Sequence, residues 1–501
     1  MPAADVLPTL PEGPVGLDAD AAYAALSARD PRFDGRVWFG VRTTGIYCRP
    51  VCPAQTPRRE NVRFFAAPAA AVSAGYRACR RCRPDSAPGS RHWDHRGDLV
   101  GRALRLVADG VVDESGVAGL AARLSVSERH LHRTLVAEVG AGPLQLALSR
   151  RAQTARLLVE QTSLPLTDVA FAAGFASVRQ FNDVMRREFG CPPSALRRAP
   201  VASLAASDPA LVLRLRLRPP YDAAEVGSFL AARTVAGLES HDVDGSGWSH
   251  RRVVPLPARP AVVQVRVTAD HAVVRSDADV RDTAALVRRV RRWLDLDCDP
   301  GAVADVLGRD AALAPLVAAR PGLRVPTTVD PWETLVRAII GQQVSVAGAA
   351  TVLARLVAAQ GRPVAEGLRA FPAAVDVAAL DPATVTGMPA ARARAVVAAA
   401  AVVASGAVDL DDPDRDAVAS RLRAVPGIGP WTVEYLRLRG LGDPDAFPAT
   451  DLVVRRSASA LGLPSSDRGL SAHAQRWSPW RSYAAAHLWA APARPRPEET
   501  A

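Results

Sequence analysis

The chain has 501 residues, of which 49% are hydrophobic and 23% are charged, and its formal net charge is +11. This length allows roughly three to five domains. Every basic side chain other than histidine is arginine, and the absence of lysine excludes mechanisms that need a side-chain amine, such as Schiff-base formation. The chain starts without a basic leader, and its longest apolar run, 395–404, is too short to cross a bilayer. We therefore expect a soluble cytoplasmic protein without a membrane partner.

The positive charge is concentrated in the first two-fifths of the chain. Residues 31–200 contain 26 arginines against 14 aspartates and glutamates, whereas the rest of the chain has a net charge of −1. A uniform preference for arginine would explain the missing lysine but not this asymmetry. A basic surplus confined to one region is expected for a surface that binds the phosphate groups of nucleic acid.

Four of the six cysteines form two tight pairs near the start of the chain. A C-x3-C pair and a C-x2-C pair are separated by 26 residues, at Cys48, Cys52, Cys79 and Cys82. This is the layout of a tetrahedral thiolate site, so we predict one bound zinc ion, which suits a reducing compartment. The other two cysteines, Cys191 and Cys298, are predicted to be buried and inert.

Residues 93–198 have helical periodicity and contain an internal repeat. Six residues recur 50 positions later with the same character: Ser127, Leu131, Leu135, Val139, Gly140 and Pro143 match Ser177, Phe181, Met185, Phe189, Gly190 and Pro193. Each copy predicts a helix-turn-helix. The first helices are expected at 117–124 and 166–173, and Ser127 and Ser177 are expected to cap the second helices. Exposed polar residues of the second helices can reach base edges in a major groove, and the candidates are Ser127, Arg129, Arg133, Arg179, Gln180 and Asn182.

The region after 210 changes from strands to helices. Strict alternation predicts strands at 211–218 and 262–267, and 291–488 reads as almost all helix. Stretches at 85–90 and 199–209 have the composition of linkers. The repeat at 93–198, between these two linkers, resembles the tandem AraC-type DNA-binding domain, because its Gly-Phe turn at 174–175 and its ending at 189–193 are typical of that family.

The sharpest motif of the helical part is 425–432. It places Gly427 and Gly429 on either side of an apolar residue, which predicts a helix-hairpin-helix turn. The glycines allow a DNA phosphate to approach the backbone, and the amides of the following helix, near Thr432, can bind it. An aspartate, Asp451, follows about 20 residues later, as in the helix-hairpin-helix DNA glycosylases.

Further matches make residues 205–492 resemble 3-methyladenine DNA glycosylase II. They are Pro-Pro-Tyr-Asp at 219–222, Arg-Ala-Ile-Ile-Gly-Gln-Gln-Val-Ser-Val at 337–346 and Trp-Arg-Ser-Tyr at 480–483. The resemblance implies that Asp451 stabilises the positive charge that builds on the sugar as the glycosidic bond breaks. A flipped base needs a stacking wall, and the aromatic candidates are Trp431, Tyr435 and Trp480.

Two positions qualify this resemblance. Bifunctional relatives carry a lysine where this chain has Trp431, so we expect a monofunctional enzyme that uses water. The family member compared carries a leucine wedge where this chain has Gln343, and a glutamine can fill the gap left by a flipped base with less apolar gain. A monovalent cation held by the hairpin carbonyls is a further candidate ligand.

Residues 39–85 resemble the amino-terminal zinc domain of the Ada family, and the match at 42–50 extends beyond the ligands. The resemblance implies that Cys48 accepts a methyl group from a DNA methylphosphotriester, with Arg49 beside it as a DNA contact. A purely structural zinc is the alternative. Loss of one negative charge at the site would raise DNA affinity, which implies a methylation-triggered switch. The Pro-Cys-His-Arg motif of a second methyltransferase domain is missing, so repair of O6-alkylguanine is not expected.

The sequence therefore predicts a mostly helical, multidomain α+β protein. The expected parts are a tail at 1–20, a small zinc-bound α/β domain at 21–90, an all-α tandem helix-turn-helix domain at 91–200, a small α+β subdomain at 205–290, an all-α helix-hairpin-helix core at 291–492 and a tail at 493–501.

We expect an alkylation-damage response protein that senses methylphosphotriesters, regulates transcription and excises bases such as 3-methyladenine. Its expected partner is double-stranded DNA, both alkylated and at promoters, with RNA polymerase as a candidate second partner and a monomeric, nucleoid-associated state. One alternative is a regulator with a catalytically inactive glycosylase remnant. The other is a repair enzyme whose zinc and helix-turn-helix parts only hold it on DNA.

Overall fold

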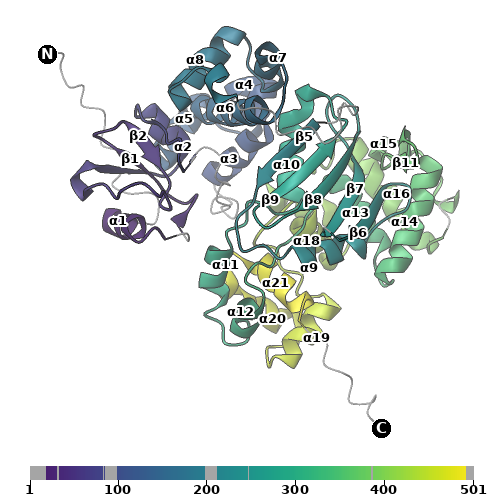
Figure 1. Cartoon of the computed structure of the whole chain (residues 1–501). Coiled ribbons are helices and arrows are strands. Elements are labelled where there is room, and N and C mark those ends of the chain that lie inside the picture. The colour runs from purple at the N-terminus through teal and green to yellow at the C-terminus, as the bar shows by residue number, and fades with distance from the viewer. Residues whose placement is uncertain are drawn as a thin grey trace. The chain divides into compact units, whose positions relative to one another are not determined.

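The computed structural model describes residues 18–30, 33–82, 84, 99–197, 211–245, 247–384 and 387–491 (Figure 1). The predicted tails and both predicted linkers, at 85–90 and 199–209, lie outside these residues, except for Asp18, Ala19 and Asp20. The chain divides into two compact units, one comprising Met1–Asp208 with Val280–Arg288 and the other Pro209–Asp279 with Arg289–Ala501. Each unit is described by itself. In the described part of the chain, no helix combines the length and apolarity needed to cross a membrane.

The first unit begins with a small sheet that carries the cysteine pairs. Its strand order is β3-β1-β2-β4, with β1 (Trp38–Val41) antiparallel to β2 (Ile46–Cys48) and β3 (Val62–Phe65), and β4 (Arg77–Ala78) parallel to β2. The accompanying helices are α1 (Ala19–Ser27), η2 (Arg59–Asn61) and α2 (Pro68–Ser73). Because β2 ends on Cys48 and β4 leads into Cys79, neighbouring strands bring the two cysteine pairs together. The predicted α/β class of this part is confirmed.

Helices α3 to α8 follow, and they include the four helices of the two predicted helix-turn-helix units. They are α3 (Leu99–Asp109), α4 (Val111–Arg123), α5 (Glu128–Val139), α6 (Pro143–Gln161), α7 (Leu166–Ala172) and α8 (Val178–Phe189), followed by η4 (Pro193–Leu196). The Ser127 hydroxyl caps α5 by accepting from the His130 amide at 3.2 Å, and Ser177 caps α8 by accepting from Gln180 at 3.1 Å. The repeated apolar residues of both copies are buried. Serine caps and four-residue apolar spacing therefore fix both helix-turn-helix units.

The second unit opens with a five-stranded antiparallel sheet in the order β5-β9-β8-β7-β6. Its elements are β5 (Leu211–Arg216), α9 (Ala223–Ala231), β6 (Glu239–Asp244), β7 (Gly247–Val254), β8 (Ala261–Val267) and β9 (His271–Ser276). Alternation predicted β5 and β8 but not β6, β7 and β9. Strands β6 and β7 bury Glu239, His250 and Arg252, and these polar residues interrupt the apolar alternation in the sequence.

The remaining elements are mostly helical. They are η5 (Val280–Asp282), α10 (Thr283–Trp293), α11 (Pro300–Leu307), α12 (Ala314–Ala319), α13 (Pro331–Ile340), α14 (Val346–Gln360), α15 (Ala374–Ala378), η6 (Pro382–Thr384), α16 (Ala390–Ala404), α17 (Arg415–Arg423), α18 (Pro430–Arg439), α19 (Leu452–Ala460), α20 (Asp467–Ala474), η7 (Gln475–Trp477) and α21 (Arg481–Trp489). A short hairpin of β10 (Pro363–Ala365) and β11 (Leu368–Arg369) corrects the all-α expectation for this core.

The helical part has two apolar cores, and α18 contributes to both. One core centres on α13, α14 and α16 and includes Val433 and Leu436 of α18. The other centres on α11, α19 and α21 and includes Leu438 of the same helix. Helix α18 is therefore held from two sides, which leaves little freedom to the residues at its N-terminal end.

A buried ion network joins α13 to the sheet. Glu333 of α13 accepts from Arg252 of β7 at 2.5 Å and from Arg337 at 2.7 Å, and Arg337 also donates to Glu239 of β6 at 2.6 Å. Two cations face two carboxylates, so burial leaves no net charge among these four residues. Removal of one of the four side chains would leave a buried charge without its partner, which typically lowers the free energy of unfolding by about 3–5 kcal/mol.

Asp330 generates a prediction about the pH dependence of stability. Its carboxylate caps α13 by accepting from the Trp332 amide at 3.0 Å. Burial, with a smaller contribution from Glu333, raises the pKa of Asp330 to about 6. The folded state thus binds the proton more tightly than the unfolded state, so a penalty that is small near pH 4 grows with rising pH and is complete above about pH 6.

We expect Asp330→Asn, which keeps a capping side chain but cannot ionise, to raise the free energy of unfolding by about 1–3 kcal/mol at pH 8 and to change it little at pH 4. Thermal melting of the whole protein at both pH values measures this. Asp222→Asn, at the cap of α9, controls for the exchange of capping residue. An equal effect of Asp330→Asn at both pH values would contradict the assignment.

Candidate functional site

The four paired cysteines form one cluster. The Sγ atoms of Cys48, Cys52, Cys79 and Cys82 all lie within 4.8 Å of one another, and all four side chains are buried. A tetrahedral zinc with Zn–S bonds of about 2.3 Å needs sulfur atoms about 3.8 Å apart. The cysteines are free of disulfides, and a donor set of four thiolates suits zinc. The cluster therefore fits a single zinc ion.

The backbone also links the two cysteine pairs. The amide of Arg49, which follows Cys48, donates to Cys82 Sγ at 3.5 Å. All four thiols are buried to a similar degree, so burial does not distinguish Cys48 from the other three.

Arg49 does not lie as the sequence analysis expected. Its Nε donates to Asp34 Oδ1 at 2.6 Å, its Nη1 donates to the Cys82 carbonyl at 3.2 Å, and the side chain is 14% exposed. Because the guanidinium is occupied within the domain, we replace the DNA-contact role with a structural one. Arg49 ties the Cys48 loop to the second cysteine pair.

The candidate base-reading residues lie at the N-terminal ends of α5 and α8. Arg129, Arg133 and Arg179 are exposed, and Asn182 is partly exposed. Ser127 is engaged as the cap of α5, and Gln180 Oε1 accepts from the Ala176 amide at 3.1 Å in the cap of α8. Backbone capping therefore occupies Ser127 and part of Gln180, and the arginines with Asn182 are the side chains best placed to reach DNA.

Asp451 lies at the start of α19 and is held by four N–H donors. Oδ1 accepts from the amides of Val453 at 2.9 Å and Val454 at 3.0 Å, and from Trp489 Nε1 at 3.1 Å. Oδ2 accepts from Trp431 Nε1 at 2.8 Å. The carboxylate thus has one fixed orientation and sits at the positive end of a helix.

Three aromatic rings surround this carboxylate. Trp431 and Tyr435 of α18 stack with centroids 5.1 Å apart and an interplanar angle of 23°, and Tyr435 meets Trp489 of α21 edge to face at 6.3 Å. All three are partly exposed. Trp480, in contrast, is 2% exposed and packs on Tyr483 in the core, so its ring faces are covered. A covered ring cannot stack on a base, and Trp489 takes its place in the candidate pocket.

The sequence patterns did not indicate Trp489, because the Trp-Arg-Ser-Tyr motif that resembles the glycosylase family ends at Tyr483. Helical spacing was the available signal: Ser482, Ala486 and Trp489 recur at four and three positions on one face of α21. Trp489 is the last residue of that helix, where its ring can leave the core.

The hairpin between α17 and α18 is stiff. Gly427 has φ +86°, and an added Cβ there would lie 2.6 Å from the Cβ of Ala395, so only glycine fits. A Cβ on Gly429 would meet no atom of the protein, so its smallness serves the approach of a partner rather than internal packing. Thr432 is buried, and its hydroxyl accepts from Gln342 Nε2 at 2.9 Å, which removes its side chain from the candidate DNA contacts.

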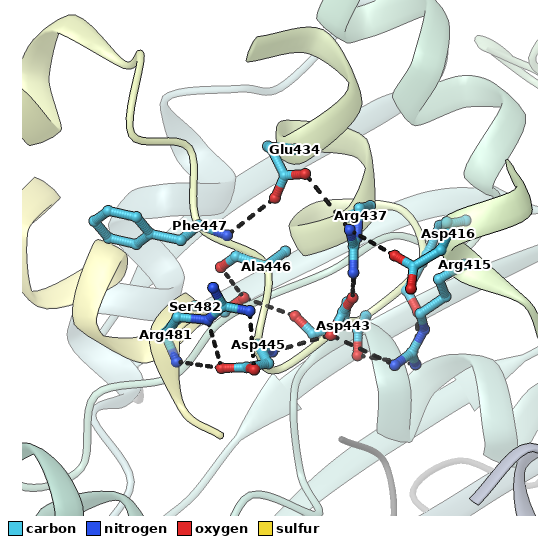
Figure 2. A network of polar contacts seen from close by, with 12 residues as sticks. Arg415, Asp416, Glu434, Arg437, Asp443, Asp445, Ala446, Phe447, Arg481 and Ser482 are labelled. Carbon is cyan, nitrogen blue, oxygen red and sulfur yellow. Dashed lines mark hydrogen bonds and ion pairs between the residues drawn. The ribbon is translucent and has the colours of Figure 1, made fainter. Parts of the chain in front are cut away.

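A polar network fixes the loop that leads to Asp451 (Figure 2). Arg437 of α18 donates to Asp443 at 2.8 Å, and Arg481 of α21 forms a bidentate pair with Asp445 at 2.8 and 3.0 Å. Burial alone would raise the pKa of Asp443, but Arg415 and Arg437 hold that pKa below its ordinary value. The loop therefore keeps its charge and its shape at neutral pH.

Comparisons with known families divide the chain in the same order. Four family models match: the metal binding domain of Ada at 21–85, a helix-turn-helix domain at 120–199, the AlkA N-terminal domain at 212–330 and the HhH-GPD superfamily of base excision DNA repair proteins at 336–482. The folds and sites above thus define a class in which an Ada-type regulator is joined to a helix-hairpin-helix DNA glycosylase.

One relative extends over nearly the whole length. The chain is 47% identical over 482 residues, covering 94% of it and 96% of the relative, to the "Probable bifunctional transcriptional activator/DNA repair enzyme AlkA" of Mycobacterium tuberculosis. It therefore belongs to the family of these bifunctional AlkA proteins.

Two partial relatives match opposite ends. The chain is 35% identical over 282 residues to DNA-3-methyladenine glycosylase 2 of Escherichia coli, covering 55% of this chain and 95% of that protein. It is 39% identical over 142 residues to the bifunctional transcriptional activator/DNA repair enzyme Ada of E. coli, covering 28% of this chain and 38% of that protein. The chain thus spans less than two-fifths of the Ada relative.

The indole donors predict a rate effect. Trp431→Phe keeps a ring for stacking but removes one N–H bond to Asp451, and Trp489→Phe does the same from the other side. We expect each variant to release alkylated bases from DNA about tenfold more slowly under single-turnover conditions. Trp480→Phe is the matched control, because its ring is buried in the core.

We expect Trp480→Phe to lower the melting temperature, while the folded variant releases alkylated bases at the wild-type rate. A loss of rate in Trp480→Phe as large as that in Trp489→Phe would contradict the reassignment of the pocket.

Proposed function

We propose that the chain is an alkylation sensor, a transcription regulator and a monofunctional DNA glycosylase in one protein. The observation that carries the glycosylase assignment is the Asp451 carboxylate, held by two indoles of an aromatic cluster next to the hairpin. The methyl-acceptor assignment is supported by the cysteine cluster and by the match of residues 21–85 to the metal binding domain of Ada. The full-length similarity to a bifunctional family supports both roles on one chain.

The pocket suits breakage of an N-glycosidic bond. An alkylated purine carries a positive charge and would stack on an exposed face of the ring cluster formed by Trp431, Tyr435 and Trp489. As the bond to the sugar lengthens, positive charge moves to the sugar, where the fixed carboxylate of Asp451 stabilises it. Water then adds to the sugar carbon and loses a proton. Asp451 can orient that water because it needs no rearrangement as charge develops.

The absence of lysine limits the outcome of this reaction. Opening the abasic site through an imine requires a side-chain amine, and the position of Trp431 is occupied by an indole that holds Asp451. The product is therefore an intact abasic site. An inactive remnant would have no reason to keep both indole donors on Asp451, so the regulator-only alternative is disfavoured.

At the other end, Cys48 would act once. The Cys48 thiolate attacks the methyl carbon of a phosphotriester, so that a sulfur–carbon bond forms, a carbon–oxygen bond breaks and the phosphodiester leaves with its negative charge. Zinc, when bound, keeps the sulfur deprotonated at neutral pH. The other three cysteines hold the site.

The transfer removes one negative charge from the cluster. Repulsion between the cluster and DNA phosphates then falls, so affinity for DNA rises. The helix-turn-helix units, with Arg129 and Arg179 exposed, direct the methylated protein to promoters, and RNA polymerase is the partner expected there. A monomeric state and a monovalent cation at the hairpin stay predictions.

Two variants separate the activities. Asp451→Asn is isosteric and neutral, so we expect release of 3-methyladenine or 7-methylguanine from alkylated DNA to fall by about 100-fold or more. The same variant should take up methyl groups from methylphosphotriester DNA as the wild type does. Release of bases and transfer of radiolabelled methyl groups, measured on one preparation, give both values.

Cys48→Ala is the reciprocal variant. We expect it to lose methyl uptake and the methylation-dependent activation of a reporter gene, while base release continues. Zinc content measured alongside shows whether three thiolates still hold the ion. Continued methyl uptake by Cys48→Ala would contradict the assignment of Cys48 as the acceptor. Absence of base release by the wild-type protein would contradict the glycosylase function and leave only the regulatory one.

A further inference from the structure

The antiparallel sheet of the second unit, in the order β5-β9-β8-β7-β6 (Figure 1), has one covered face and one open face. Leu213 and Leu215 of β5 and Val265 of β8 are buried on the covered face. Trp248 of β7 lies on the same face, and its Nε1 donates to the Ala223 carbonyl of α9 at 2.7 Å. Successive side chains of a strand point to opposite sides, so the residues between these lie on the other face, which we call the open face.

Arginine occupies five positions of the open face. The strand register aligns Val212 of β5, Arg275 of β9, Gln264 of β8 and Arg251 of β7 in one row across the sheet. The positions two and four residues further along β5, and two further along β8, share this face. The five residues are Arg214, Arg216, Arg251, Arg266 and Arg275. The first two are exposed and the other three are partly exposed.

The acidic residues of the open face lie on the edge strand β6. Asp242 and Asp244 are exposed there, beside β7. Arg266 donates to the two oxygens of Asp244 at 3.0 and 2.7 Å, so the charges of this pair cancel. Along the five strands the open face carries five arginines and two aspartates, which is a net charge of +3 with histidine neutral. The positive charge gathers on four residues that we call the sheet patch: Arg214, Arg216, Arg251 and Arg275.

Helix α9 separates the sheet patch from the candidate catalytic centre. The Arg439 guanidinium of α18 lies over the ring of Phe229 in α9, 4.2 Å from its centroid, and over the ring of Trp489 at 5.1 Å. Trp489 in turn donates to Asp451. Because α9 packs on the covered face, the sheet patch points away from Asp451. It is therefore no part of the surface that would hold a flipped base.

The dimensions of the sheet patch suit the backbone of duplex DNA. Three strand spacings separate β5 from β7, which is about 14 Å, and Arg214 and Arg216 are about 7 Å apart along β5. A guanidinium binds a phosphate through two parallel N–H bonds, and Gln264 between the arginines adds a neutral donor for phosphate or sugar oxygens. A duplex presents two rows of phosphates on either side of a groove about 12 Å wide, whereas a single strand presents one row. A patch about 14 Å wide can contact both rows.

We propose that the sheet patch binds the phosphate backbone of duplex DNA, as a segment separate from the one at Asp451. The inference goes beyond the proposed function, because neither base release nor methyl transfer requires this surface. Contacts to phosphates carry no sequence information, so the binding is independent of sequence and weakens as salt is added. The protein then holds an undamaged duplex while Asp451 acts on another segment.

Photo-crosslinking in the whole protein tests this location. Val212, which lies on the open face and is 38% exposed, is replaced by p-benzoylphenylalanine, and capture of a labelled undamaged duplex is measured. Val243 is the matched control position, because it is 76% exposed and lies opposite Trp248, on the other face of the same sheet. We expect capture from position 212 to exceed capture from position 243 by about tenfold. Addition of Arg214→Gln and Arg251→Gln should lower capture from position 212 by about tenfold or more.

Arg309→Gln with Arg476→Gln removes the same charge from exposed positions outside the sheet and should leave capture from position 212 unchanged. Equal capture from positions 212 and 243 would overturn the inference, and so would capture that Arg214→Gln and Arg251→Gln do not lower. Capture of labelled polyglutamate in place of the duplex would also overturn it and would assign the patch to an acidic protein segment. Base release by Arg214→Gln with Arg251→Gln should equal that of the wild type, and a parallel loss of base release would contradict the separation of the patch from Asp451.

Discussion

The orientation of one carboxylate depends on four N–H donors from separate parts of the chain. Two backbone amides of α19 and the indoles of Trp431 and Trp489 fix both oxygens of Asp451. The indoles come from α18 and α21, which are more than 40 residues apart in sequence. This arrangement of donors therefore exists only when these helices are packed, and the two apolar cores that meet on α18 supply that packing.

Charged networks then connect this centre to the surface that meets DNA. Arg437 and Arg481 hold the acidic loop before Asp451 (Figure 2), while Glu333 and Arg337 tie α13 to the antiparallel sheet. Because α13 ends at the loop that carries Gln343, the network also fixes where that loop begins. A buried network of this kind adds little net stability but specifies one arrangement, which is what a positioned loop needs.

Sequence patterns predicted elements wherever one local rule governed them. The caps Ser127 and Ser177, the buried apolar repeat and the cysteine spacing all correspond to the structure, because each depends on residues a few positions apart. The failures involve distant partners. Trp480 and Trp489 look alike in sequence, and only the packing of α21 decides which ring is covered. Strands β6 and β7 were missed because their buried charges find partners on α13.

The two groups proposed to react are held in different ways. Asp451, proposed to stabilise a cation without attacking it, shares its charge among four N–H donors that fix its position. Cys48, proposed to attack, lies in a buried cluster of four thiols, in which the amide of Arg49 donates to Cys82. A stabilising carboxylate needs donors that fix its charge, whereas a nucleophilic thiol needs neighbours that keep it deprotonated, and in both cases the fold supplies them.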